Sequence, residues 1–404
     1  MARGSPQKPA IVQDGRGLTY DQWRRASGAL AHRLRRAGLG DGATIALQLP
    51  NGPEFAIALL GAWQAGAAVL PLDPGITTSE RDTYCRRAGA AGVLTAADPL
   101  LRGPDEPAHS PAPAATPGLA PEATALLLLS SGSTGEPKLV RRTWARVRAA
   151  AGVFQTALPC TADDRVLGVL PFYHAAGLFN VLLASLHRGA TLFIEPFSPR
   201  TTAATIQRER ITMLAGSPFM YRLLGQTRFA SPPDFSSLRI AYAGTSAMSM
   251  AILEAFQGRF GVAITQGYGT TETNAVAVTR PGQRVDRPGL VGRPYPGITV
   301  SIRDDAGEPL PAGAEGTVWI HSPGAALDYL GDPQATAETF RDGWVVTGDL
   351  GRLHESGDLE ILGRRRAMLN VAGRKVAPAE VEACLRGHGA VAEAAVSGAP
   401  GPDG

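Results

Sequence analysis

The stretch Ser130-Ser131-Gly132-Ser133-Thr134-Gly135-Glu136-Pro137-Lys138 decides how this chain is interpreted. It directly follows the apolar run 126–129, which is typical of a buried strand. Hydroxyls, glycines and one lysine after a strand suit a loop around a polyphosphate, because glycine lets backbone N–H groups approach an anion and Lys138 adds a point charge. The Walker spacing is absent, since Leu139 follows the lysine. A flexible Ser/Gly turn is the alternative interpretation of the loop taken alone.

Composition sets the class of protein. The chain has 404 residues, of which 44% are hydrophobic and 19% charged, and this predicts a globular protein with at least two subdomains. A net charge of +3 does not indicate a nucleic-acid or membrane partner. Cys85, Cys160 and Cys384 have no metal-ligand spacing, which favours a reducing compartment. No apolar segment reaches the ~20 residues of a membrane span and no secretory signal is visible, so we expect a cytoplasmic protein.

Helix and strand patterns alternate along the first part of the chain, with a helix at 18–37, a strand at 44–49, a helix at 53–66 and a strand at 68–72. This alternation predicts a layered α/β fold with parallel strands, and a second set of strand–helix units covers roughly 164–260. The segment 99–121 is rich in Pro and Ala and predicts a surface loop. From about residue 289, short β-like runs separated by Gly and Asp turns predict a small β subdomain.

Four further segments follow in order along the chain: Pro171-Phe172-Tyr173-His174-Ala175-Ala176-Gly177, Gly267-Tyr268-Gly269-Thr270-Thr271-Glu272, Trp344-Val345-Val346-Thr347-Gly348-Asp349, and Gly363-Arg364 with 373–382. Together with the loop at 130–138, they resemble the signatures of the adenylate-forming superfamily, which includes acyl-CoA synthetases, adenylation domains and luciferase-like ligases. The resemblance covers nearly the whole chain. Taken alone, Asp349 is more typical of a turn cap than of a ligand-binding residue, and Glu272 is equally typical of a helix cap.

The resemblance implies ATP-dependent activation of a carboxylic acid as acyl-adenylate, then transfer to the thiol of CoA or of a phosphopantetheine on a carrier protein. It implies that Lys138 and the loop residues bind the pyrophosphate, the loop residues being Ser131, Gly132, Ser133, Thr134 and Gly135. Glu272 would bind Mg2+ and Thr271 would donate to the α-phosphate.

Other motif residues are assigned to the nucleotide and the gate by the same resemblance. Tyr268 would stack on adenine, Asp349 would accept from both ribose hydroxyls, and Arg364 would help to hold the ribose. Gly244 and Thr245 would lie against adenine and acid. His174 resembles the aromatic gate between the acid pocket and the thiol tunnel.

The acid itself is inferred from the gate region. In the family that the chain resembles, amino-acid adenylation domains use an aspartate in this region to pair the α-ammonium. Residues 172–183 contain no acidic residue, so the resemblance implies an aryl or short acyl acid rather than an α-amino acid. The run Lys138-Leu139-Val140-Arg141-Arg142-Thr143 is similar to a segment of aryl-acid-activating enzymes. Motif proximity predicts a pocket formed by Phe179, Asn180, Ser217, Tyr242 and Ala243.

The chain departs from the family in its last part. We expect an AMP-binding domain at 1–364 and an incomplete mobile domain at 365–404, in which a hairpin-like piece and a helix at 378–385 fit and to which the family's late lysine cannot be matched. Arg366 stands at the hinge, where the family often has Asp or Lys. Two alternatives stay open: an adenylating enzyme that uses an amine or an inorganic anion as acceptor, and a non-catalytic nucleotide- or acyl-binding homologue.

Overall fold

The computed structural model describes residues 5–101, 120–130, 137–246, 248–283 and 285–365, and, after these, 369–371, 374–376, 381–382, 384–385, 388, 390–391 and 394–397. The loop residues 131–136, most of the segment 99–121, and Arg366 lie outside the described residues. No helix in the described part of the chain is both long enough and apolar enough to cross a membrane.

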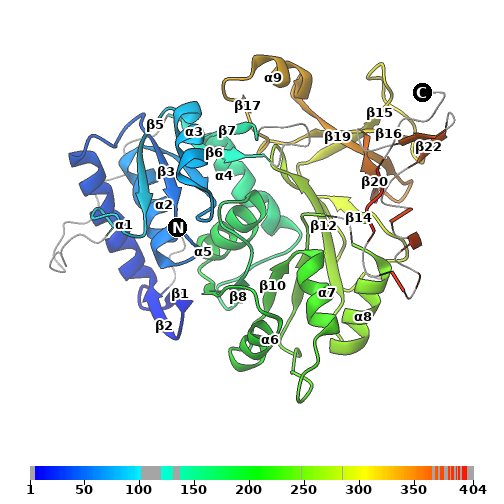
Figure 1. Ribbon diagram of the computed structural model, residues 1–404, viewed down its shortest axis with the longest axis horizontal. Coiled ribbons are helices and arrows are strands. Elements are labelled where there is room, and N and C mark those ends of the chain that lie inside the picture. The colour runs from blue at the N-terminus through cyan, green and yellow to red at the C-terminus, as the bar shows by residue number, and fades with distance from the viewer. Residues whose placement is uncertain are drawn as a thin grey trace.

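A six-stranded sheet forms the first layer (Figure 1). Its strands run in the order β17-β7-β6-β4-β3-β5, with bounds β3 Thr44–Gln48, β4 Ala68–Leu72, β5 Ala90–Thr95, β6 Thr124–Leu129, β7 Leu139–Thr143 and β17 Asp328–Tyr329. The four strands β5, β3, β4 and β6 are parallel, whereas β7 and β17 are antiparallel additions at one edge. The predicted strands and their parallel arrangement are therefore confirmed.

Helices α1 (Tyr20–Arg36) and α2 (Pro53–Ala65) pack against each other beside this sheet. α1 begins where the Thr19 side chain accepts from the backbone of Gln22 and the Gln22 side chain accepts from the backbone of Thr19. Apolar residues at helical spacing bury one face, and the Trp23 indole donates to the carbonyl of Ala56 at 3.0 Å. The helices α3 (Thr78–Ala88) and α4 (Trp144–Val153) complete this part.

A second sheet follows the order β15-β16-β19-β20-β14-β13-β12-β11-β10-β8-β9-β1-β2, and β18 (Phe340–Arg341) pairs with β19. Its parallel centre is β9 (Thr191–Ile194), β8 (Arg165–Gly168), β10 (Met213–Gly216), β11 (Ile240–Ala243) and the first part of β12 (Ile264–Thr270). β1 (Pro9–Gln13) is parallel to β9, and β2 (Arg16–Thr19) is antiparallel to β1. Helices α6 (Pro199–Arg208), α7 (Pro218–Gln226) and α8 (Met250–Phe260) connect these strands (Figure 1).

The expected small β subdomain is present, and it is continuous with the second sheet. Its antiparallel strands are β13 (Asn274–Val278), β14 (Leu290–Pro294), β15 (Thr299–Arg303), β16 (Glu315–His321), β19 (Trp344–Leu353) and β20 (Leu359–Arg364). The turn from β12 to β13 makes the join, because β12 is parallel to β11 on one side and antiparallel to β13 on the other. Beyond it, α9 (Pro333–Thr339) follows β17.

The end of the chain agrees with the sequence where it is described. β21 (Leu369–Val371) and β22 (Arg374–Val376) form the expected antiparallel hairpin. Residues 381–382 and 384–385, within the predicted helix 378–385, are helical.

Candidate active site

Several of the motif residues follow the carboxyl ends of parallel strands. The loop at 130–138 follows β6, His174 follows β8, Ser217 follows β10, and Gly244 and Thr245 follow β11. Open α/β sheets bind ligands at this edge, because the loops that leave adjacent strands meet there. Tyr268 and Thr271 lie at the end of β12, so segments that are distant in sequence come together.

The gate segment, defined here as Leu170–Leu178, folds on itself. The His174 N–H donates to the carbonyl of Pro171 at 3.2 Å, and the Leu178 N–H donates to the carbonyl of His174 at 2.9 Å. A Cβ added at Gly177 would lie 2.0 Å from the Pro171 oxygen, so only glycine fits this turn. After the turn the chain enters η2 (Ala176–Leu183), a π-helix, a form that is frequent at functional sites.

His174 is partly exposed and partly covered at the end of this turn, with its ring centroid 4.5 Å from that of Tyr173. Desolvation by the surrounding protein lowers the pKa of His174, against the opposing charge of Asp73. The imidazole is therefore neutral at neutral pH and can accept a proton.

The predicted pyrophosphate site is built around Tyr329 in the part that the structure describes. The Lys138 Nζ lies 4.7 Å from the centroid of the Tyr329 ring, and the Tyr329 hydroxyl donates to Glu272 Oε1 at 2.8 Å. Burial, and then the charge of Glu272, raise the pKa of Tyr329 far above its ordinary value, so the hydroxyl remains a donor. One tyrosine thus holds the lysine and the carboxylate of two separate motifs in one corner.

Arg142 contacts the backbone next to Glu272. Its side chain is fully buried, and it donates to the carbonyls of Thr271 at 2.7 Å and Gly324 at 3.2 Å. Its guanidinium also lies 5.4 Å from the centroid of the Phe179 ring, while Nη1 has no hydrogen-bond partner. Burial lowers the pKa of Arg142 to about 10, and Glu272 opposes this shift, so the group is charged at neutral pH.

The residues fit a magnesium ion that is held jointly with a nucleotide. Mg2+ is usually bound through one or two carboxylates plus substrate phosphates, and Glu272 supplies one such carboxylate. Among the described residues, no three acidic, histidine or cysteine side chains gather into a protein-only metal site. When bound, the ion neutralises phosphate charge beside Lys138.

A second corner joins β12, β19 and β20. The Tyr268 hydroxyl donates to Asp349 Oδ2 at 2.6 Å, and the Arg364 Nε lies 2.8 Å from Asp349 Oδ1. Asp349 is 4% exposed, and burial raises its pKa although Tyr268 and Arg364 pull in the opposite direction. A carboxylate has about four acceptor sites, so these two bonds leave capacity for ribose hydroxyls.

Tyr242 occupies the space beside the predicted adenine loop. A Cβ at Gly244 would lie 2.9 Å from the Tyr242 hydroxyl oxygen, and one at Gly267 would lie 2.4 Å from it. The close approach that Gly244 permits is therefore made by a side chain of the protein itself. Thr245, which follows, has φ of 81°, a left-handed conformation that is strained for a β-branched residue.

The predicted acid-pocket residues divide into buried and half-buried groups. Phe179, Asn180, Tyr242 and Ala243 are buried, and Asn180 Oδ1 has no hydrogen-bond partner. Ser217 caps α7, since its hydroxyl accepts from the Met220 N–H at 3.4 Å. The Phe154 ring packs edge-on against Tyr242, with centroids 5.1 Å apart.

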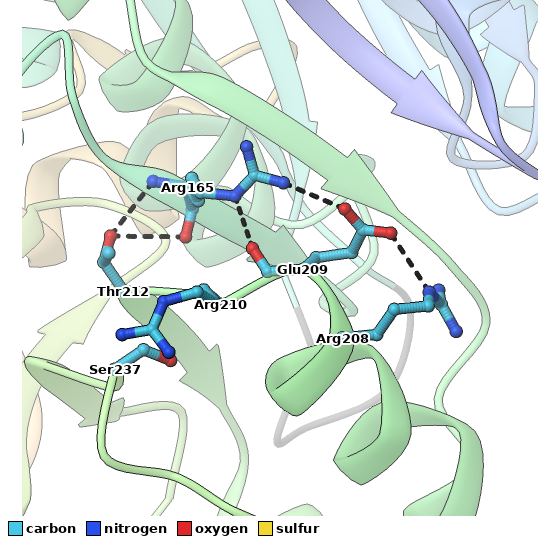
Figure 2. Close-up of a pocket in the computed structure, with 6 residues that line it drawn as sticks. All are labelled: Arg165, Arg208, Glu209, Arg210, Thr212 and Ser237. Atoms are coloured by element: carbon cyan, nitrogen blue, oxygen red, sulfur yellow. Dashed lines mark hydrogen bonds and ion pairs between the residues drawn. The ribbon is translucent and has the colours of Figure 1, made fainter.

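A hollow of about 450 Å³ lies near the amino ends of strands β8 and β10, whereas the motif residues follow the carboxyl ends of the parallel strands (Figure 2). It is lined by Arg165, Arg208, Glu209, Arg210, Thr212 and Ser237, and it contains none of the motif residues. Arg165 and Arg208 both contact the Glu209 carboxylate, which neutralises much of their charge. Arg165 and Thr212 stand at the amino ends of β8 and β10, away from the edge that carries the site.

Three residues that contact the candidate site were assigned no role from the sequence. Arg142 belongs to the quoted run 138–143, so its pattern was visible but its contacts were not. Tyr329 lies in a two-residue strand that no local pattern indicates. Asn51 follows β3 and contacts the gate segment through two hydrogen bonds.

Comparisons with known proteins identify the family of the chain. The family model described as "AMP-binding enzyme" matches residues 1–330. The chain belongs to the AMP-binding enzyme family.

Two relatives illustrate the kinds of ligase that this AMP-binding enzyme resembles. A feruloyl-CoA synthase from Amycolatopsis sp is 32% identical, over 99% of this chain and 84% of the relative. The fatty acid–[acyl-carrier-protein] ligase ScoC of Streptomyces coeruleorubidus is 31% identical, over 99% of this chain and 82% of that protein.

A solved structure of o-succinylbenzoate CoA synthetase (MenE) from Bacillus subtilis, in complex with ATP and magnesium ion, superposes with a TM-score of 0.88. It is 27% identical and covers 98% of this chain and 85% of its own. This AMP-binding enzyme is an acid–thiol ligase that works through an acyl-adenylate, with ATP and Mg2+ as cofactors.

Proposed function

We propose that the two corners divide the nucleotide between them. Lys138, the loop residues 131–135 and Glu272 with Mg2+ would hold the pyrophosphate, and Thr271 would donate to the α-phosphate. Tyr268 would stack on adenine, while Asp349 and Arg364 would hold the ribose. The carrying observation is the chain of contacts Lys138–Tyr329–Glu272, because it brings a cation and a carboxylate from separate motifs to one point.

These residues meet the electrostatic demand of the first step. A carboxylate attacks the α-phosphate of ATP and pyrophosphate leaves, so two anions must approach and negative charge must be stabilised on the leaving group. Lys138 and the loop donors would supply that stabilisation. Arg142 holds the carbonyl of Thr271, which keeps Thr271 and Glu272 in place.

The acid would be an aryl or short acyl acid. The buried, charged guanidinium of Arg142 lies against Phe179 in the predicted pocket, and it would repel the α-ammonium of an amino acid. The named relatives act on feruloyl, o-succinylbenzoyl and fatty acyl groups, and they support a substrate without an α-ammonium.

The acceptor would be the thiol of CoA or of a carrier protein's phosphopantetheine. The neutral His174 would stand at the gate and take the thiol proton as the thiol attacks the acyl-adenylate, with AMP leaving. We further propose an AMP-binding domain at 1–364, a part of the family's small domain at 365–404, and a cytoplasmic location.

An acid-dependent ATP–pyrophosphate exchange screen tests this function. Aryl and short acyl acids should support exchange, and each should exceed its α-amino analogue. Lys138→Ala and Glu272→Ala should lower exchange by about 100-fold, since each removes an electrostatic contact to the leaving group or its metal. Binding of AMP, which lacks that group, should change little.

A matched control is Glu254→Ala, which removes an exposed carboxylate on α8. Equal losses of ATP and AMP binding in the Lys138 and Glu272 variants would contradict their assignments. No exchange with any acid would support the non-catalytic alternative. Adenylation followed by transfer to an amine but not to a thiol would support the amine-acceptor alternative.

A further inference from the structure

Asn51 joins the six-stranded sheet to the gate segment. It lies just beyond the carboxyl end of β3 and far from the gate in sequence. Its side-chain Nδ2 donates to the carbonyl of Leu170 at 2.8 Å, and its Oδ1 accepts from the N–H of Phe172 at 2.8 Å. The side-chain amide therefore uses both of its ends on one short piece of backbone.

The two contacted groups flank Pro171, which has no N–H of its own. An amide pairs with a carbonyl and an N–H as a neighbouring strand would, so Asn51 acts as a one-residue partner for this segment. An aspartate of the same shape could accept from Phe172, but it would set an oxygen against the Leu170 carbonyl. The site therefore demands asparagine by its chemistry and not by its size.

Two neighbouring contacts attach the same segment to the same sheet. The Phe172 ring is fully buried and packs on Phe55 of α2, with centroids 5.5 Å apart. Asp73, beyond the carboxyl end of the adjacent parallel strand β4, lies close enough to Tyr173 to raise the pKa of its hydroxyl in addition to burial, and its Oδ1 accepts from the Gly75 N–H at 2.8 Å. The gate belongs to the second sheet in sequence, but its position is set from the first.

We propose that Asn51 is a positioning residue for the gate, which fixes where His174 stands during thiol transfer. This inference rests on the proposed thiol-transfer function. Asn51 acts on the backbone four and two residues before His174, and the turn that leads to His174 is closed by the His174–Pro171 hydrogen bond. Loss of the amide releases the start of the turn while its end remains in η2.

The test compares Asn51→Ala and Asn51→Asp with wild type in two half-reactions. Thioester formation from the acyl-adenylate should fall by about 10- to 100-fold in both variants, as expected for a misplaced reacting group. Pyrophosphate exchange should stay within about threefold, because in the described part of the chain the Asn51 side chain hydrogen-bonds the gate segment and none of the proposed nucleotide residues. The matched control is Gln48→Ala, since this amide at the end of the same strand donates to the Ile76 carbonyl and not to the gate segment.

A double-mutant cycle with His174→Ala separates positioning from general loosening. If Asn51 acts through His174, adding Asn51→Ala to His174→Ala should cause little further loss of thioester formation. Additive losses, equal losses in both half-reactions, or an equal effect of Gln48→Ala would overturn the proposal.

Hydrogen–deuterium exchange supplies a readout that does not depend on turnover. The Phe172 amide in Asn51→Ala should exchange about five- to tenfold faster, which is the loss of one hydrogen bond of ~1 kcal/mol. Unchanged exchange there would overturn the positioning role whatever the activity. Absence of pyrophosphate exchange in wild type would instead count against the proposed function.

Discussion

The gate segment and the second corner, called here the ribose corner, both position side chains proposed to bind ligands. They differ in how those side chains are held in place. The gate is a contiguous stretch whose turn closes through its own backbone and through Gly177. The ribose corner takes Tyr268, Asp349 and Arg364 from three strands and holds them by side-chain contacts. A local turn depends on sterics, whereas a convergent corner depends on charge and burial, so the two regions should respond to different substitutions.

The largest effect is expected when the gate loses its glycine. Gly177→Ala places a methyl group 2.0 Å from the Pro171 oxygen, so the backbone must move, and the free energy of unfolding should fall by about 3 kcal/mol or more. Denaturant unfolding checks this. Gly152→Ala on α4, where an added Cβ meets nothing within 4 Å, is the control and should be neutral or stabilising. Similar stability of the two variants would contradict the steric account.

The ribose corner should lose function and keep stability. Asp349→Asn should weaken ATP binding by about 10- to 100-fold, because hydrogen bonds to a charged group contribute about 1.5–3 kcal/mol. Isothermal calorimetry measures this loss, and Asp163→Asn, at an exposed position, is the control.

The same variant has a signature in pH. Since burial raises the pKa of Asp349, the wild-type carboxyl favours the folded state most when it is protonated, and this contribution is lost as pH rises through the raised pKa. The stability of Asp349→Asn relative to wild type should therefore increase from about pH 4 upward. A decrease over that range would show that the bonds from Tyr268 and Arg364 outweigh burial.

Substitution of Arg142 probes the pyrophosphate corner, which is the cluster of Lys138, Tyr329 and Glu272. We expect an effect of intermediate size. Arg142→Met leaves the carbonyls of Thr271 and Gly324 without their donor, so pyrophosphate exchange should fall about tenfold and unfolding free energy by about 1–2 kcal/mol. Arg142→Lys keeps the charge but loses the planar guanidinium that donates to both carbonyls. Its loss of exchange and of stability should therefore be intermediate. Arg141→Met, the next residue on β7, which pairs with Asp328 instead, is the control. A full loss in the lysine variant would assign the effect to geometry alone.

The smallest effect is expected at Thr245. Its φ of 81° is unfavourable for a β-branched residue, and glycine adopts that conformation freely, so Thr245→Gly should raise the free energy of unfolding by about 1 kcal/mol. Thermal unfolding measures this change. A loss of stability would show that contacts of the Thr245 side chain exceed the strain.

The sequence predicted the structural features that depend on neighbouring residues. It did not predict the contacts between residues that are far apart in the chain. Strand–helix alternation predicted the parallel strands and both α/β layers, and the Pro and Gly of the gate motif agree with its turn. The hydrogen bond from Tyr268 to Asp349 joins residues far apart in the chain, and no pattern at either position indicates it. Asn51 and Tyr329 were missed because a lone amide and a two-residue strand carry no periodic signal.

The short strand β17 also affects how the chain must fold. β7 presents its outer edge to β17, and this pairing forms only after the chain has been made through Tyr329. Until then the first sheet has an open edge beside its hydrophobic core, and such edges promote intermolecular pairing. Asp328 and Tyr329 therefore cover part of the β7 edge late in synthesis, and Tyr329 completes the pyrophosphate corner in the same step.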